Sequence, residues 1–132
     1  MQTYRMRVER VDESHARASV RDFSLVLGAR RADPAAGFNP VETLLAAAGD
    51  CLLTALEHVA RLSQVAVAAA VELEAVREEK PPRLTEIRWL LKVASDASDE
   101  RIERLVALAQ ANSTVFRTVA MAVDMRGRWE RA

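Results

Sequence analysis

The sequence predicts an α+β protein with the element order β-β-β-α-β-β-α-β, in which antiparallel sheets surround a long central helix. Two observations support this prediction. Apolar and polar residues alternate with a period of two near both ends of the chain and again after its middle, which is typical of strands with one buried face. Between these stretches, residues 39–64 are apolar at three- and four-residue steps, which is typical of a helix.

Length, charge and cysteine content limit the classes of protein to consider. The 132 residues suit a single domain, residues 1–132. The 19 basic and 19 acidic residues cancel and are interspersed, so we expect no nucleic-acid partner. The charged amino terminus and the acids within residues 39–64 predict neither a signal peptide nor a membrane span. The single cysteine cannot form an internal disulfide, which suits a cytoplasmic protein.

Three short antiparallel strands are predicted before the central helix. Turns are expected at residues 12–14 and at Arg21-Asp22, where the alternation changes phase. Residues 28–38 have no period and contain proline and glycine, so they form a loop. The residues expected on the buried face of these strands are Tyr4, Met6, Val8, Ala16, Ala18, Val20, Phe23, Leu25 and Leu27.

The central helix has a well-marked start. Asn39 is a good N-cap, Pro40 occupies the first helical position, and Glu42 stands at the capping-box position. Its polar residues fall within a narrow arc and are Thr43, Asp50, Thr54, Glu57 and Arg61. A helix that is apolar over most of its circumference needs either a wrapped sheet or a second copy of itself. The small residues 46–49 let another backbone approach closely, so a homodimer is predicted.

After the central helix, residues 65–78 and 84–93 alternate as two strands joined by a hairpin loop at residues 79–82. Ser98 then caps a second, amphipathic helix whose buried stripe comprises Ile102, Leu105, Val106 and Ala109. Residues 112–118 are expected to form a break or a short helical turn. A final strand is predicted from Val119 to Trp129.

The only cysteine, Cys51, lies in the middle of the predicted central helix, on its apolar face and beside the polar arc. A lone cysteine most often packs as a small hydrophobic residue. A reactive thiol needs a positive partner or a helix N-terminus. Asp50 has the wrong sign, and His58, on nearly the same face, lies about 10 Å along the helix axis. Any activating arginine must therefore come from another part of the fold.

The remaining candidates favour structural roles. Glu42 is nine residues from Cys51 and roughly opposite it around the helix, so the capping box is preferred to a catalytic carboxylate. His15 and His58 have no metal-like spacing, and we expect no metal or other cofactor. Ser113 has neither a local histidine base nor the glycine context of a hydrolase nucleophile. The two tryptophans, Trp89 and Trp129, are more typical of a core or an interface than of a ligand platform.

The run from Asn39 to Cys51 resembles a family signature, Asn-Pro-x-Glu-x-Leu-(x)6-Cys. This is the signature of the OsmC/Ohr family, the osmotically inducible and organic hydroperoxide resistance proteins. The element order predicted after this run also matches, so the resemblance covers nearly the whole chain. It implies an OsmC-like fold, an intertwined homodimer whose central helices pack together, and a thiol site at the dimer interface.

The resemblance also implies roles for individual residues. In the peroxidase members, a thiolate at the position of Cys51 attacks a hydroperoxide and becomes a sulfenic acid, which a second cysteine resolves. Residues 109–116 match the segment of that second cysteine, and Ser113 occupies its position; a hydroxyl cannot form the disulfide. Glu42 matches the glutamate of the broader OsmC-like group, whereas the Ohr-type position holds Val41. The activating arginine of the family lies in the N-terminal strands.

Two functions follow from this resemblance. The first is a one-cysteine, thiol-dependent organic hydroperoxide reductase linked to oxidative stress defence, in which an external thiol reduces oxidised Cys51. Its further catalytic residues are Glu42 and either Arg17 or Arg21, which the sequence does not distinguish. The second is a non-peroxidase protein that keeps the family cavity, beside a buried Cys51, for a small apolar ligand.

Overall fold

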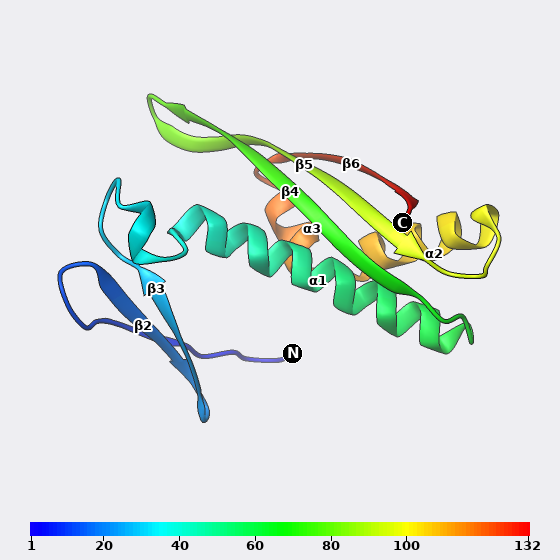
Figure 1. Ribbon diagram of the computed structural model, residues 1–132, viewed down its shortest axis with the longest axis horizontal. Helices are drawn as coiled ribbons and strands as arrows, with labels where there is room; N and C mark the ends of the chain where they lie inside the picture. Colours follow the sequence, from blue (N-terminus) through cyan, green and yellow to red (C-terminus); the bar gives the residue numbers. More distant parts are fainter. The chain divides into compact units, whose positions relative to one another are not determined.

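The computed structural model describes all 132 residues, and the chain comprises two compact units, residues 1–44 and 45–132, which we describe separately (Figure 1). The predicted α+β class and element order are confirmed, with a 3-10 turn η1 and a short helix α3 in addition. The elements are β1 (Arg7–Arg10), β2 (His15–Val20), β3 (Phe23–Gly28), η1 (Pro34–Ala36), α1 (Pro40–Leu62), β4 (Ala68–Glu79), β5 (Pro82–Ala94), α2 (Asp99–Asn112), α3 (Thr114–Ala120) and β6 (Asp124–Arg131).

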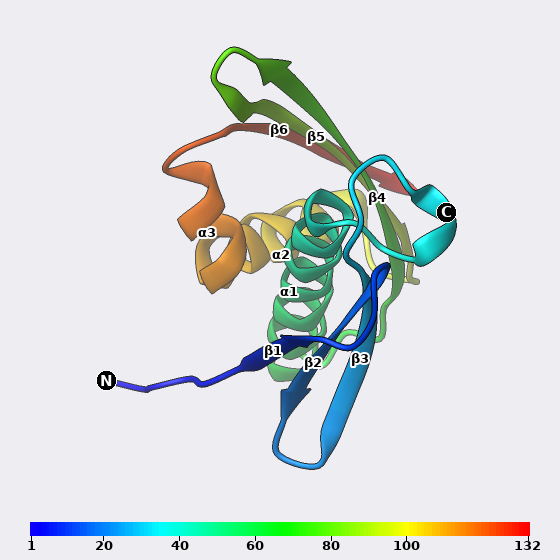
Figure 2. The same ribbon diagram turned by 90° about the vertical axis from the view of Figure 1, so that its left-hand side faces the viewer.

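The N-terminal unit contains the three antiparallel strands predicted, in the order β1-β2-β3 (Figure 2). At the β1–β2 turn, Asp12 accepts a hydrogen bond from the Ser14 backbone N–H at 2.8 Å and contacts the His15 ring at 2.9 Å. The Ser14 bond and the His15 contact hold the pKa of Asp12 below its ordinary value. The tight turn expected at Arg21-Asp22 is present, with Arg21 in the left-handed region at φ 51.

The apolar face of this N-terminal sheet is exposed, so the expectation of a buried face was wrong for the isolated chain. On β3, Phe23 is 67% exposed and Leu25 is 65% exposed, whereas Ala18 is the one buried hydrophobic residue of the three strands. The first strand also begins only at Arg7. The reason is that the N-terminal unit contains no second layer of its own to cover a three-stranded sheet.

In the C-terminal unit, the sheet β4-β5-β6 carries helices α1, α2 and α3 on one face (Figures 1 and 2). Alternate residues of β5 point toward the helices, and the opposite face is charged, with Lys92 near Glu72 and Arg88 near Glu86. The core of this unit consists of Leu52, Ala55, Leu56, Val59, Ala60, Trp89, Leu91, Val93, Ile102, Leu105, Val106, Ala109 and Phe116. This core fixes the position of α1 against α2 and α3.

Strand β6 differs from the prediction in two ways. It runs parallel to β5, so the expectation of antiparallel sheets was wrong for this pair, because α2 and α3 carry the chain back across the sheet before β6 begins. The strand also starts at Asp124 rather than at Val119. Helix α3 corresponds to the short helical turn that was one of the two outcomes expected for residues 112–118, and it includes the first two residues of the predicted strand because Phe116 is buried in the core.

Helix α1 is the core helix of the protein. By length and composition alone it could cross a membrane. However, Leu52 and Leu56 are fully buried in the core of the C-terminal unit. Gly49 lets the helix approach β4 closely, because a Cβ atom there would lie 2.9 Å from the Leu73 side chain. The helix is thus packed against the sheet as a soluble protein's core helix would be.

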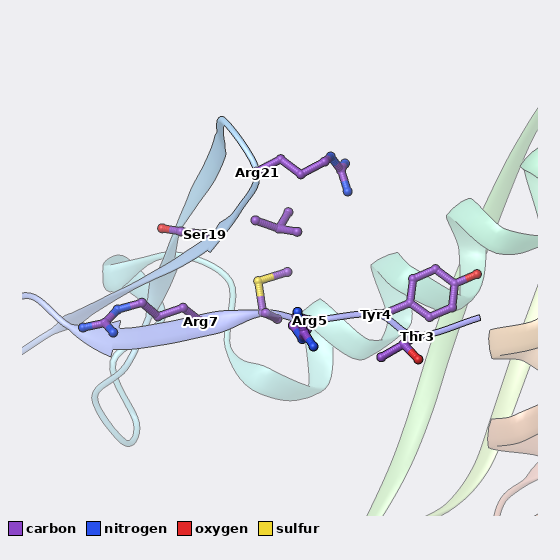
Figure 3. Close-up of a pocket in the computed structure, with 8 residues that line it drawn as sticks. Thr3, Tyr4, Arg5, Arg7, Ser19 and Arg21 are labelled. Carbon is purple, nitrogen blue, oxygen red and sulfur yellow. The ribbon is translucent and has the colours of Figure 1, made fainter. Parts of the chain in front are cut away.

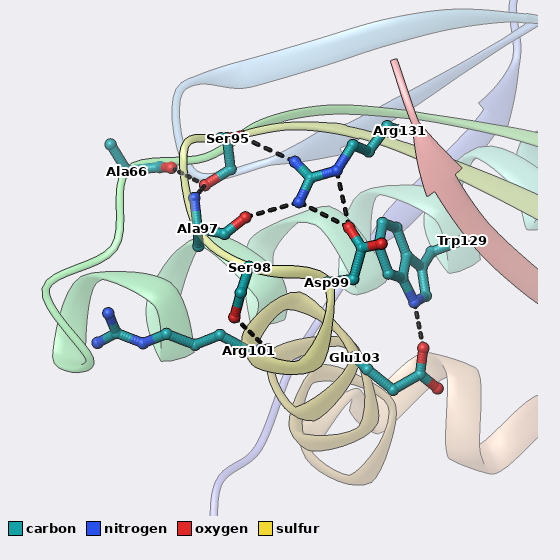
Figure 4. A network of polar contacts seen from close by, with 9 residues as sticks. All are labelled: Ala66, Ser95, Ala97, Ser98, Asp99, Arg101, Glu103, Trp129 and Arg131. Atoms are coloured by element: carbon teal, nitrogen blue, oxygen red, sulfur yellow. Dashed lines mark hydrogen bonds and ion pairs between the residues drawn. The ribbon is translucent and has the colours of Figure 1, made fainter.

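A polar network fixes the C-terminal end of β6 to the loop before α2 (Figure 4). Arg131 donates hydrogen bonds to the carboxylate of Asp99 at 2.8 Å, to the Ser95 carbonyl at 2.9 Å and to the Ala97 carbonyl at 2.6 Å. The Trp129 indole donates to Glu103 of α2. These bonds restrain α2, whose far end leads into the α2–α3 junction described next.

Candidate functional site

Helix α1 and the α2–α3 junction line a groove of about 520 Å³. Cys51 is half-buried and is part of the groove lining. The lining residues are Ala47, Asp50, Cys51, Thr54, Ala55, His58, Asn112, Thr114 and Val115. Every one of them belongs to the C-terminal unit, residues 45–132.

The spacing of α1 explains which of its side chains reach the groove. Cys51 and His58 are seven residues apart, which is about two helical turns, so both lie on the same side of the helix. Ala47 and Ala55 stand one turn before and after Cys51, and Val115 contributes apolar surface from α3. The groove therefore combines apolar walls with a thiol and a few polar groups, an arrangement that suits a small organic molecule with a polar head.

The groove lining contains one carboxylate, Asp50, and one imidazole, His58, and it contains no lysine or arginine. The one arginine of α1, Arg61, instead pairs with Glu57 at 2.7 Å on the exposed side of the helix. This hydrogen bond and the charge of Arg61 hold the pKa of the Glu57 carboxyl below its ordinary value. Helix α1 therefore supplies no guanidinium to the thiol.

Ser113 lies between α2 and α3 and is completely buried, with 0% of its surface exposed. Its hydroxyl donates a hydrogen bond to the Ala109 carbonyl at 2.6 Å, and its own carbonyl accepts the first backbone bond of α3 from Arg117 at 2.8 Å. The neighbouring residues Asn112 and Thr114 line the groove, whereas Ser113 does not. The segment that matches the family's second cysteine, residues 109–116, thus borders the groove. The Ser113 hydroxyl is occupied by its hydrogen bond to the Ala109 carbonyl.

Glu42 forms the predicted capping box. Its carboxylate accepts a bond from the Asn39 N–H at 3.0 Å, and its own N–H donates to the Asn39 side chain at 2.8 Å. A separation of nine residues places Glu42 about 13 Å from Cys51 along the helix axis. The structure therefore confirms that Glu42 caps the helix. Within α1, Glu42 lies too far from Cys51 to contact it.

Both candidate arginines belong to the N-terminal unit. Arg17 lies on β2 opposite Glu9 in the strand register, and the Arg21 guanidinium lies over the Phe23 ring, 5.5 Å from its centre. Activation of Cys51 by either residue stays a prediction. No group of three or more histidine, cysteine or acidic residues in the chain could hold a metal ion.

The α2–α3 side of the groove could not be identified from the sequence. Asn112, Thr114 and Val115 reach it because the chain turns at Ser113 and begins a new helix. The signal for this turn is the polar run Asn112-Ser113-Thr114, since asparagine, serine and threonine favour helix ends. They lie in the stretch expected to form a break or a short helical turn, and their position opposite α1 depends on the packing of Phe116.

The protein is an α+β protein in which a long capped helix carries a thiol and packs against a three-stranded sheet. The family model described as OsmC-like protein matches residues 32–126, which is most of the chain. The chain therefore belongs to the OsmC-like family, and the resemblance carried by Asn39 to Cys51 is confirmed. No curated protein matches the chain.

Solved structures confirm the OsmC-like fold. An OsmC-like protein from Mycoplasma pneumoniae superposes with a TM-score of 0.90 at 17% identity, covering 99% of this chain and 98% of the other. A hypothetical protein from Aquifex aeolicus gives 0.86 at 21% identity, with 100% and 98% covered. The organic hydroperoxide resistance protein OhrB of Bacillus subtilis gives 0.71 at 18% identity, with 96% and 98% covered.

Proposed function

We propose that the protein is a one-cysteine, thiol-dependent organic hydroperoxide reductase with Cys51 as its peroxidatic residue. The observation that carries this proposal is that Cys51, the single cysteine, lines a groove of about 520 Å³. An inert packed cysteine would instead be enclosed by core side chains. The family membership and the names of fold neighbours as organic hydroperoxide resistance proteins support the same chemistry.

In the proposed reaction, the Cys51 thiolate attacks the terminal oxygen of a hydroperoxide ROOH. The O–O bond breaks as the S–O bond forms, so Cys51 is oxidised to sulfenic acid and the peroxide is reduced to the alcohol ROH after it takes up a proton. The apolar walls Ala47, Ala55 and Val115 would contact the organic group. This preference predicts faster reaction with an organic hydroperoxide than with hydrogen peroxide.

Reduction of the sulfenic acid requires an external thiol in this proposal, because the chain has one cysteine. A first thiol molecule forms a mixed disulfide with Cys51 and releases water, and a second thiol molecule displaces Cys51 and leaves as a disulfide. The position of the second cysteine in the family would correspond to Ser113, whose hydroxyl cannot take part in this exchange. A lone thiol cycle of this kind also fits a reducing cytoplasm.

We also propose that the active form is a homodimer. The N-terminal sheet exposes the apolar side chains of Phe23 and Leu25, and the segment before it exposes Tyr4. An exposed apolar face of this kind is typical of an interface. A second copy of the chain is the occupant that the family membership favours.

A second candidate function is binding of a small apolar ligand in the groove without peroxidase chemistry. The observation that favours it is that no arginine or lysine lines the groove to stabilise a thiolate. Under this alternative, Cys51 packs beside the ligand and remains a thiol when a hydroperoxide is added.

Mass spectrometry of the whole protein separates the two candidates. After one equivalent of cumene hydroperoxide in the presence of dimedone, a peroxidase should acquire one dimedone adduct at Cys51, and Cys51→Ser should acquire none. An equal amount of hydrogen peroxide should react more slowly. If Cys51 stays reduced while a hydrophobic fluorescent probe binds the groove and is displaced by small apolar molecules, the peroxidase proposal is wrong and the binding function stands.

Ser113→Cys tests the correspondence of Ser113 with the resolving cysteine. If it is right, oxidation of this variant by one equivalent of hydroperoxide should produce an intramolecular disulfide with Cys51, because the two Cα atoms then lie within disulfide reach. Ala111→Cys is the matched control, since Ala111 lies two residues away at the end of α2 and is exposed, whereas Ser113 is buried. Peptide mapping without reduction should detect the disulfide in the first variant only.

A further inference from the structure

Three polar side chains form a line along α1 within the groove, at Cys51, Thr54 and His58. At about 100° per residue they fall within an arc of about 60° around the helix. They are three and four residues apart, and side chains at these spacings are neighbours, with about 5–6 Å between their Cβ atoms. Because helical side chains lean toward the N-terminus, His58 leans toward Thr54 and Thr54 toward Cys51. Thr54 therefore bridges the distance of about 10 Å along the axis that separates His58 from the thiol.

The Thr54 hydroxyl and the His58 imidazole have no competing partner in the chain. The hydroxyl of Thr43, on the same helix, donates to the carbonyl four residues before it at 2.8 Å, whereas that of Thr54 makes no hydrogen bond. The neighbouring carboxylate, Glu57, accepts bonds at both of its oxygens from Arg61, at 3.2 and 2.7 Å, and His58 forms no ion pair. Both groups are therefore available to a molecule in the groove.

The imidazole of His58 is the one basic side chain of the groove lining. The arginines around a hollow at the N-terminal strands are Arg5, Arg7 and Arg21 (Figure 3). They belong to the N-terminal unit and do not line the groove. The other charged groups near His58 are on α1 itself, namely Asp50 in the lining and the pair of Glu57 and Arg61. The α2–α3 wall contributes no titratable side chain, so the groove contains one residue of the type whose charge ordinarily changes between pH 5 and 8.

We propose that Thr54 and His58 transfer the proton in the reaction of Cys51, an inference that rests on the peroxidase function proposed above. The imidazole takes the proton of the thiol through the Thr54 hydroxyl, which leaves a thiolate and an imidazolium. This step supplies within the C-terminal unit a positive partner for the thiolate, which the groove otherwise lacks.

The same proton is needed again when the peroxide bond breaks. The thiolate attacks the terminal oxygen of ROOH, the S–O bond forms, and negative charge develops on the oxygen that leaves with the organic group. The Thr54 hydroxyl donates to this oxygen and takes a proton from His58 in return, so that ROH leaves and a neutral imidazole remains. The proton lost by the thiol thus ends on the alcohol, and the step requires no other reactant.

The rate of Cys51 oxidation by cumene hydroperoxide as a function of pH, measured on the full chain by rapid mixing and a dimedone quench, tests the inference. The parent should give a bell-shaped profile, because the reaction needs both a thiolate and an imidazolium. His58→Gln should lose the falling limb at high pH and slow the reaction about tenfold or more at neutral pH. His15→Gln is the matched control, since it replaces the one other histidine, in the N-terminal unit, and should keep the rate and profile of the parent.

Two variants at Thr54 separate the hydroxyl from the shape of the side chain. Thr54→Val removes the hydroxyl and keeps the branched shape, so it should also slow oxidation about tenfold. Thr54→Ser keeps the hydroxyl and should retain most of the rate. Alkylation by iodoacetamide provides a second readout, because the leaving iodide needs no proton, and His58→Gln should slow it less than it slows oxidation.

The possible failures are distinguishable. A parent protein that is not oxidised at any pH would contradict the proposed peroxidase function, and the proton transfer with it. A reactive parent whose rate and profile are unchanged in His58→Gln would contradict the proton transfer alone. Equal slowing of alkylation and oxidation in His58→Gln would mean that the imidazole acts only on the thiol. Equal slowing by Thr54→Val and Thr54→Ser would exclude a role for the hydroxyl.

Discussion

Gln64 ends helix α1 in the left-handed region, at φ 57. Its N–H donates to the Arg61 carbonyl at 3.0 Å, and the next N–H, of Val65, donates to the Ala60 carbonyl at 2.9 Å. This pair of bonds is a Schellman motif, in which the residue at the position of Gln64 is usually glycine. A side chain with a Cβ atom is strained there because the Cβ atom approaches the following carbonyl oxygen.

Gln64→Gly should therefore stabilise the protein by about 0.5–1 kcal/mol, since it removes this strain and keeps both hydrogen bonds. Gln64→Ala keeps the Cβ atom and should change the stability by no more than a few tenths of a kcal/mol. Urea denaturation of the two variants and the parent, followed by circular dichroism, gives the comparison. A glycine variant no more stable than the alanine variant would contradict the strain argument.

At the scale of single residues, the sequence predicts the functional candidates unequally. Cys51 and the capping pair of Asn39 and Glu42 could be identified because their signals are local: a fixed spacing within one helix and a capping box. The groove partners Asn112 and Thr114 could not, because they meet α1 only through the packing of α2 and α3. A pattern read along the chain contains no information on which helices become neighbours.

Among the elements, β6 depends on a close contact with β5. Gly127 stands opposite Trp89 in the parallel register, and a Cβ atom on Gly127 would lie 2.0 Å from the Trp89 ring. The ring also packs edge-on against Phe116, with 5.8 Å between the ring centres. The indole is therefore held between β6 and α3, and neither side leaves space for an added methyl group.

Gly127→Ala should destabilise the protein by about 1–3 kcal/mol, because the Trp89 ring must move within a filled core. Arg128→Ala is the matched control, since it changes the next residue of the same strand on the exposed charged face. Thermal unfolding of both variants measures the difference. An unchanged melting temperature in Gly127→Ala would mean that β6 can shift away from the tryptophan without cost.

Element by element, the strands and helices with a clear period and clear ends were predicted well. The strand predicted from Val119 starts only at Asp124, because burial of Phe116 stabilises helix α3 up to Ala120 despite the alternation of Val119, Met121 and Val123. The parallel pairing of β6 could not be predicted from the alternation of residues, because parallel and antiparallel strands have the same period of two. Its direction follows from the connection through α2 and α3.

For the whole molecule, the central question is what covers the apolar face of the N-terminal sheet. On β3, Leu25 pairs in register with Ala18 on this face, and the adjacent Val26 pairs with Arg17 on the opposite, charged face. Leu25 and Val26 are similarly exposed, at 65% and 59%. The two positions therefore form a matched pair of exposed aliphatic residues on one strand that present opposite faces.

If a second copy covers the apolar face, Leu25→Asp should weaken dimerisation by orders of magnitude, because an unpaired carboxylate would be buried in the interface. Val26→Asp adds the same charge to the other face and should leave the dimer intact. Sedimentation velocity over a range of concentrations measures both, with circular dichroism to check folding. In the parent and in Val26→Asp, the unfolding midpoint should rise with protein concentration, since association stabilises the folded state. A parent protein that sediments as a monomer, or equal dimerisation by the two variants, would show that this face is not the interface.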